Sequence, residues 1–228
     1  DGRNIDVKAK AVHARGGFRY LQPADDEPWL GILAGISTDD GSQAWRYFPE
    51  NLMGKDLVDY LSGAIQGGEA DNATLVYGGN PHLFPYLHNE GQFQVLVPLR
   101  NAKFAFQPDW PALTDLNIEL NFINDGLWMK TDSVNLGGVK ASNLTANIPD
   151  YAKEKLLIDA DIKGPGKAVG PYFDETPLKD SLGATLQELQ LDGDVNARLH
   201  LDIPLDGEMT QATGDVTLKN NDLLIKPL

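Results

Sequence analysis

The chain has 228 residues, 42% hydrophobic and 23% charged, and its 33 acidic against 19 basic side chains give a formal net charge of -14. This is a globular composition with enough apolar side chains for a core, and the excess of acid argues against binding to nucleic acid or, by charge alone, to anionic lipid headgroups. Because the chain has no cysteine, disulfides, thiol catalysis and cysteine-ligated zinc are excluded.

The first half of the chain contains several runs in which apolar and polar residues alternate. A period of two is typical of strands with one dry and one wet face, which belong to antiparallel sheets. The runs lie at residues 5–9, 93–97, 104–106 and 116–122, with a weaker one at 70–77. We therefore expect strands at these positions.

One amphipathic helix is predicted among these strands. Apolar residues from Met53 to Ile65 recur at helical spacing, with Pro49 near the start and Gly67 and Gly68 as a stop. The pattern predicts a helix over about residues 51–66.

The second half of the chain holds the longest alternating run, Leu189–Ile203. At about 3.3 Å per residue this run would reach roughly 50 Å, more than twice the length of a usual strand, so we expect a tall or strongly curved sheet. Further runs lie at 158–162 and 216–218, with weaker ones at 127–131 and 139–148. Short helical stretches bounded by Pro or Gly are predicted near 167–173 and 177–186.

Together these elements predict a mainly β fold, in which about ten strands follow one another as a meander of antiparallel hairpins. Two architectures are compatible with it. In a closed sandwich the apolar faces of two sheets meet, and periodicity alone favours this commoner outcome. In an open, curved sheet the apolar face lines a trough, and an uncovered apolar trough implies an apolar ligand.

The sequence offers little for catalysis. His82, His88 and Glu90 come nearest to a metal cluster, but the two histidines are six residues apart across Pro85, which predicts a solvated loop. The stretch 164–170 resembles a phosphate-binding loop, yet it has proline where a donor is needed and alanine in place of the hydroxyl, so it predicts a turn. No Gly-x-Ser-x-Gly motif occurs.

Three tryptophans, Trp45, Trp110 and Trp128, have the chemistry to stack on sugar rings, although single aromatic residues in a β protein are more often core or rim anchors. A carbohydrate-active enzyme is therefore a third interpretation, behind binding and structural roles. No spacing among the 33 acidic residues singles out a catalytic pair.

Several stretches are similar to the AsmA-like family, and together they cover nearly the whole chain. They are Trp45–Gly54, Leu61–Gly68, Phe84–Tyr86, Gly91–Phe93 and Phe104–Pro111, continued from Leu178–Leu182 to Pro204 and Leu205. The resemblance implies a very long, bridge-like lipid transport protein of the periplasm, anchored in the inner membrane by an N-terminal helix. The chain begins with Asp1 and ends in a strand-like stretch, Leu223–Leu228, so we expect one continuous internal segment, residues 1–228, of such a protein.

The resemblance also implies a function: phospholipids move from the inner to the outer membrane along a repeating β-groove, with their acyl chains in an open hydrophobic groove. No catalytic residue comes with the family, so we expect no enzyme, no cofactor and no metal. The expected partners are phospholipid acyl chains and, at both ends, the rest of the same long chain. The fragment alone is expected to be a monomer, or edge-paired in crystals. The alternative remains a β-sandwich binding or adhesion module without lipid.

Alternation then selects the side chains expected to face lipid, and the helix over 51–66 becomes a lid on the groove or a mobile gate. Leu120, Phe122 and Val195, with Leu199 and Leu201, are expected to contact acyl chains, whereas Asn121 and Arg198 are not. The full expected set is Ile5, Val7, Phe93, Val95, Val97, Phe104, Phe106, Leu116, Ile118, Leu120, Phe122, Ile158, Ile162, Leu191, Val195, Ala197, Leu199, Leu201, Ile203, Val216 and Leu218.

Overall fold

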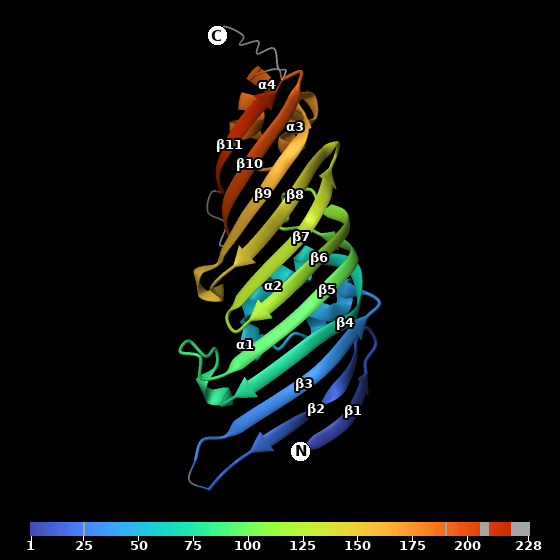
Figure 1. The fold of residues 1–228 in the computed structure, drawn as a ribbon, viewed down its shortest axis with the longest axis vertical. Coiled ribbons are helices and arrows are strands. Elements are labelled where there is room, and N and C mark those ends of the chain that lie inside the picture. The colour runs from blue at the N-terminus through green and yellow to red at the C-terminus, as the bar shows by residue number, and fades with distance from the viewer. Residues whose placement is uncertain (25, 190, 206–209, 220–228) are drawn as a thin grey trace.

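A computed structural model describes residues 1–24, 26–189, 191–205 and 210–219 (Figure 1). The strand-like stretch Leu223–Leu228 lies outside the described residues.

The described residues form one antiparallel sheet of eleven strands whose order in space follows their order in the chain. Figure 1 shows the strands stacked along the long axis of the molecule. The prediction of a mainly β, open sheet is confirmed, and the closed sandwich is wrong because all described strands belong to a single sheet. The strands are β1 (Gly2–Lys8), β2 (His13–Leu21), β3 (Trp29–Thr38), β4 (Ile65–Gly79), β5 (Gln92–Phe104), β6 (Leu113–Ile123), β7 (Gly126–Leu136), β8 (Val139–Ile148), β9 (Lys155–Pro165), β10 (Asp194–Pro204) and β11 (Gln211–Lys219).

Short helices lie in four of the connections between strands. In Figure 1 α1 and α2 lie behind the middle strands, and α3 and α4 lie near the C-terminal end. The helices are η1 (Gly41–Tyr47), α1 (Glu50–Met53), α2 (Lys55–Ala64), η2 (Pro81–Leu83), η3 (Tyr151–Lys153), α3 (Gly166–Asp174), the π-helical η4 (Lys179–Gly183) and α4 (Ala184–Leu189).

The helix expected over residues 51–66 is broken and ends early, so that prediction was wrong in its bounds. Gly54 separates α1 from α2 with a backbone φ of 84° and ψ of 149°, a conformation outside the helical region that favours glycine. Ile65 and Gln66 already belong to β4. The two helical stretches expected near 167–173 and 177–186 are confirmed as α3 and as η4 with α4.

The strand expected over Leu189–Ile203 begins only at Asp194, so Leu189 and residues 191–193 were wrongly assigned, and residue 190 lies outside the described residues. Leu189 ends α4, and Leu191 lies against Gly166, where an added Cβ would come within 2.4 Å of the leucine. The Gly193 carbonyl accepts a hydrogen bond from the Gly166 amide, which ties this connection to the start of α3. Long strands occur elsewhere instead, since β4 has 15 residues and β5 has 13.

Strands β2 and β3 were not predicted from the sequence. In β3 both faces carry apolar residues or glycine, such as Ile32 on one face and Leu33 on the other, so the period-two contrast is absent. In β2 the adjacent glycines Gly16 and Gly17 interrupt the apolar series.

Strand register brings the apolar residues of neighbouring strands onto one side of the sheet, here called the inner face. Val95 of β5 lies opposite Leu75 of β4 and Phe122 of β6, and Phe122 in turn lies opposite Leu127 of β7. The same parity continues to β10, where Ala197 lies between Ile162 and Val216. One uninterrupted apolar face therefore crosses all eleven strands.

The other side, the outer face, carries polar pairs between strands. Gln94 donates a hydrogen bond to Asn121 at 2.9 Å, and Lys130 forms an ion pair with Glu119 at 3.1 Å. Opposite polar and charged neighbours of this kind stabilise a wet sheet face by a few tenths of a kcal/mol each, on the order of 0.2–1 kcal/mol. The segregation expected from alternation is thus present in the structure.

Candidate functional site

The inner face is open to solvent at both ends of the described sheet. On β1 and β2, Val7 is 53% exposed and Phe18 is 43% exposed, and on β11 Val216 is 55% exposed. Apolar side chains gathered on one uncovered surface are unusual in a monomeric protein and mark a binding surface.

The middle of the inner face is covered by the connection between β3 and β4, residues 39–64, here called the helical insert. Helix α2 turns Leu57, Leu61 and Ala64 into the core, and Leu61 is fully buried. Burial also raises the pKa of Tyr60 well above its ordinary value, because an ionised phenol is poorly solvated there. The helical insert is therefore packed on the sheet as an apolar cover.

A cavity of about 150 Å³ remains between the helical insert and the sheet. Phe48 of the insert lies over Phe122 of β6, with ring centroids 6.3 Å apart. An apolar space of this size accepts small apolar groups. Its apolar walls come from Ile36, Phe48, Met53, Ile65, Leu75, Phe93, Val95, Val97, Leu99, Leu120 and Phe122, among others.

A second, smaller cavity of about 50 Å³ lies at the C-terminal end. Phe106 and Trp110, from the connection between β5 and β6, form one wall, and Tyr172 and Phe173 of α3 form another. Burial raises the pKa of Tyr172 to about 12. The second cavity is therefore as apolar as the first.

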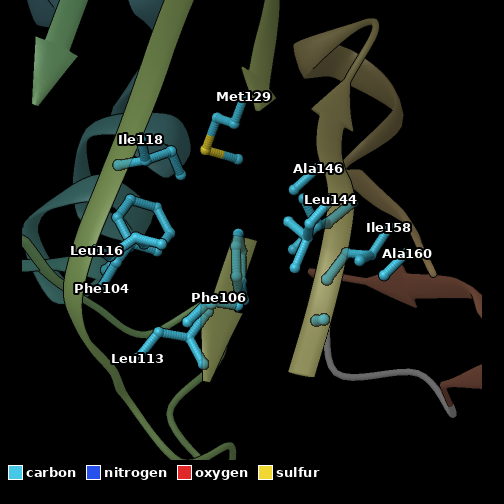
Figure 2. Packing of buried hydrophobic residues seen from close by; sticks show 14 of the residues in the cluster. Phe104, Phe106, Leu113, Leu116, Ile118, Met129, Leu144, Ala146, Ile158 and Ala160 are labelled. Carbon is cyan, nitrogen blue, oxygen red and sulfur yellow. The ribbon is translucent and has the colours of Figure 1, made fainter. Parts of the chain in front are cut away.

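Side chains fill the space between the two cavities. Phe104, Leu116 and Ile118 are at most 2% exposed, and the rings of Phe104 and Phe106 lie 4.9 Å apart. Figure 2 shows these residues gathered in one interior with Met129 of β7 and Leu144 of β8. The inner face is therefore open to solvent at both ends, partly hollow under its covers and filled by side chains between them.

The structure places the residues expected to face lipid on the inner face of strands, except Phe106 and Leu191, which lie in connections. Ile5, Val7 and Val216 belong to the open ends. Phe93, Val95, Val97, Leu120 and Phe122 line the first cavity, and Phe106, Ile158, Ile162, Leu199 and Leu201 line the second. Phe104, Leu116, Ile118, Leu191, Val195 and Ile203 are buried by protein, and Ala197 and Leu218 are half-buried.

Sequence reasoning missed several residues of the same surface. Phe18 and Tyr20 of β2 lie on the open inner face, and Ile36 of β3 and Phe48 of the helical insert line the first cavity. Phe18 and Tyr20 are separated by one polar residue, Arg19, which is a period-two signal, but the run is too short to stand out.

The weaker chemical candidates have ordinary structural roles. In the 80–91 loop, Glu90 accepts a hydrogen bond from the backbone amide of His88, and within the described residues no cluster of His, Asp and Glu suits a metal ion. The 164–170 stretch is the β9–α3 junction, where the Gly166 amide is already bonded to the Gly193 carbonyl. The interpretation of this stretch as a turn was therefore wrong, because residues 164 and 165 end β9 and residues 166–170 begin α3.

The three tryptophans lie apart from one another in structural positions. Trp110 packs against the core, and the Arg46 guanidinium lies 5.5 Å from the ring centroid of Trp45. The ring of Trp128 covers Gly126 on the outer face, so close that a Cβ on that glycine would meet it at 2.4 Å. These contacts favour the anchor interpretation over sugar stacking.

Comparison with known proteins identifies the family. None of the helices among the described residues is long and apolar enough to cross a membrane. The chain is 91% identical, over all 228 residues, to the intermembrane phospholipid transporter YhdP of Escherichia coli (strain K12), and it spans 18% of that protein's length. No solved structure matches the chain. Because the family described as "YhdP protein" also matches residues 1–228, this chain belongs to the YhdP family.

Proposed function

We propose that this chain is one segment of a hydrophobic conduit that carries phospholipids from the inner to the outer membrane. The observation that carries the proposal is the single apolar face that crosses eleven strands and is left uncovered at both ends. The relative that is named an intermembrane phospholipid transporter supports the choice of ligand. In this proposal the inner face holds acyl chains and the polar outer face meets water, so the segment needs no catalytic group.

The energetics suit a sliding ligand. Each buried methylene of an acyl chain contributes about 0.8 kcal/mol, and the contact is non-directional, so a chain can shift along the face without breaking specific bonds. The net charge of -14 keeps the segment apart from other anionic surfaces. A place in the periplasm, as part of an inner-membrane-anchored protein, follows from this proposal.

The helical insert is the proposed lid of this segment. Acyl chains can reach Val7, Phe18 and Val216 directly, whereas Leu120 and Phe122 lie beneath the insert. Passage along the middle of the segment therefore requires the insert to move away from β5 and β6, or lipid to enter the first cavity beneath it. Fully buried residues such as Leu116 contact lipid only in the open state.

Native mass spectrometry of the gently purified chain tests the proposal. We expect peaks that carry added phospholipid mass, and a variant with a charge on the open inner face, Val216→Asp, should lose most of them. Its matched control is Thr217→Asp, one residue away on the outer face and also exposed. A lipid-free mass together with failure to bind an apolar dye would contradict the conduit.

A further inference from the structure

A polar recess adjoins the first cavity where β3 meets the helical insert. It has a volume of about 570 Å³ and shares Val12, Ser37, Thr38 and Tyr47 with the walls of the apolar cavity. An amphipathic molecule is therefore offered an apolar space and a polar space side by side.

Three charged side chains line this recess without an ion-pair partner in the described part of the chain: Lys10, Arg46 and Asp39. Tyr47 also lines the recess, and the two other titratable groups there, His13 and Asp40, are hydrogen-bonded. His13 is bonded to Asp6 at 2.8 Å, and Asp40 accepts hydrogen bonds from the amide and hydroxyl of Ser42. The recess thus presents two cations and one carboxylate that have no ion-pair partner in the described part of the chain, and one of the cations, Arg46, also lies over the ring of Trp45.

Hydrogen bonds fix the segments that carry these charges. The buried Thr38 hydroxyl donates to the Ala11 carbonyl at 2.7 Å, and it accepts from the Asp40 amide at 3.2 Å. Thr38 therefore joins the β1–β2 turn, next to Lys10, to the start of the helical insert. The fold therefore fixes the backbone of the segments that carry these charged side chains.

We propose that the recess binds the zwitterionic headgroup of a phospholipid while one of its acyl chains occupies the adjoining cavity. Lys10 and Arg46 face the phosphate, and Asp39 faces the ammonium group. The match lies in charge as well as in place, because a zwitterionic headgroup offers both signs and the recess holds groups of both signs. This inference rests on the proposed function and names a headgroup subsite within it.

Titration calorimetry with dihexanoyl phosphatidylethanolamine, kept below the concentration at which it forms micelles, tests the subsite. The double variant Lys10→Ala with Arg46→Ala should bind about fivefold more weakly, the size expected for two exposed charge contacts. The control, Lys140→Ala with Lys163→Ala, removes the same charge from the outer face and should bind as the parent chain does. All three proteins should unfold at the same temperature, and Lys10→Gln with Arg46→Gln replaces the first variant if it does not fold.

Two further ligands identify the headgroup. Asp39→Asn should weaken binding of dihexanoyl phosphatidylethanolamine two- to threefold and leave dihexanoyl phosphatidylglycerol, which has no ammonium group, unaffected. Inorganic phosphate should bind far more weakly than either lipid; equal binding would make the recess a site for free phosphate and overturn the proposal.

If the two double variants bind lipid equally, the headgroup subsite is wrong while the conduit stands. If the parent chain binds no lipid, the proposed function itself fails.

Discussion

At the scale of single residues, the bend of the sheet depends on asparagine and aspartate in an uncommon backbone conformation. Asn4, Asn101, Asp115 and Asn143 all have φ close to +50°, and each lies at a shift in strand register. A left-handed residue at a bulge adds one residue to one strand, bends it and increases its twist. Asn and Asp adopt this conformation more readily than other residues with a side chain, which explains their choice here.

Asp115→Val tests this role of the bulge residues. A β-branched side chain at φ 53° is strained, so we expect the free energy of unfolding to fall by about 1–2 kcal/mol. Asp115→Gly should be at least as stable as the parent chain, because glycine has no Cβ to clash. Urea denaturation measures both, with Thr114→Val as an exposed neighbour whose change should stay within about 0.5 kcal/mol. If Asp115→Val and Thr114→Val lower the free energy of unfolding equally, the conformational explanation is wrong.

The sequence predicted the two faces of a strand well where apolar and polar residues alternate strictly along it. From Val195 to Ile203 every inner residue was assigned correctly, because register shifts are absent from the pairing of β10 with β9. The cavity beneath Phe48 was not predictable, since Phe48 and Phe122 are far apart in the chain and meet only through the packing of the insert.

At the scale of elements, the helical insert covers the middle of the inner face. Its sequence predicted an amphipathic helix, and α2 confirms that part with Leu57, Leu61 and Ala64 facing the core. The break at Gly54 was missed because glycine inside a helical pattern is tolerated, and only its φ of 84° marks it as a junction. We infer that this junction sets the angle at which α2 lies on the sheet.

Two glycines of the insert provide a matched test. A Cβ would meet nothing within 4 Å at either Gly54 or Gly63, so the two positions differ in backbone conformation and not in space. Gly54→Ala should destabilise the insert by about 1–3 kcal/mol, because that conformation is nearly restricted to glycine. Gly63→Ala, inside α2, should be neutral or stabilise it by roughly 0.5 kcal/mol.

Hydrogen exchange of the α2 amides measures both changes. Exchange there should accelerate in Gly54→Ala while the amides of β6 keep their protection, since the sheet does not depend on that junction. Uniform acceleration across α2 and β6 would show that the insert opens only when the whole chain unfolds. In that case the insert could not act as a lid.

At the scale of the whole molecule, the sheet is a strip with different properties on its two sides. The outer face carries polar pairs between strands, with exceptions such as Leu33 of β3, and the inner face is apolar from β1 to β11, with covers over its middle and over its C-terminal part. An ordinary core would be closed by a second layer along its full length. This segment instead leaves apolar side chains such as Val7 and Val216 uncovered, as a surface that carries an apolar ligand requires.

The fold class followed from period-two alternation and short spacings, which need no knowledge of distant contacts. The choice between sandwich and open sheet did not follow, because both satisfy the same alternation and differ only in what covers the inner face. The family resemblance carried by Trp45–Gly54 and the later stretches supplied that choice, and the sheet order confirmed it.

Site-specific photo-crosslinking in cells shows which face of the sheet contacts phospholipid. A photoreactive residue placed at Val7, Phe122 or Val216 should capture phospholipid, and one placed at the adjacent outer positions Lys8, Asn121 or Thr217 should not. Each pair differs by one residue in sequence and by the face of the sheet in space. If the inner face carries lipid, only the three inner positions capture phospholipid, whereas equal capture from both sets would show that the two faces do not differ in lipid contact.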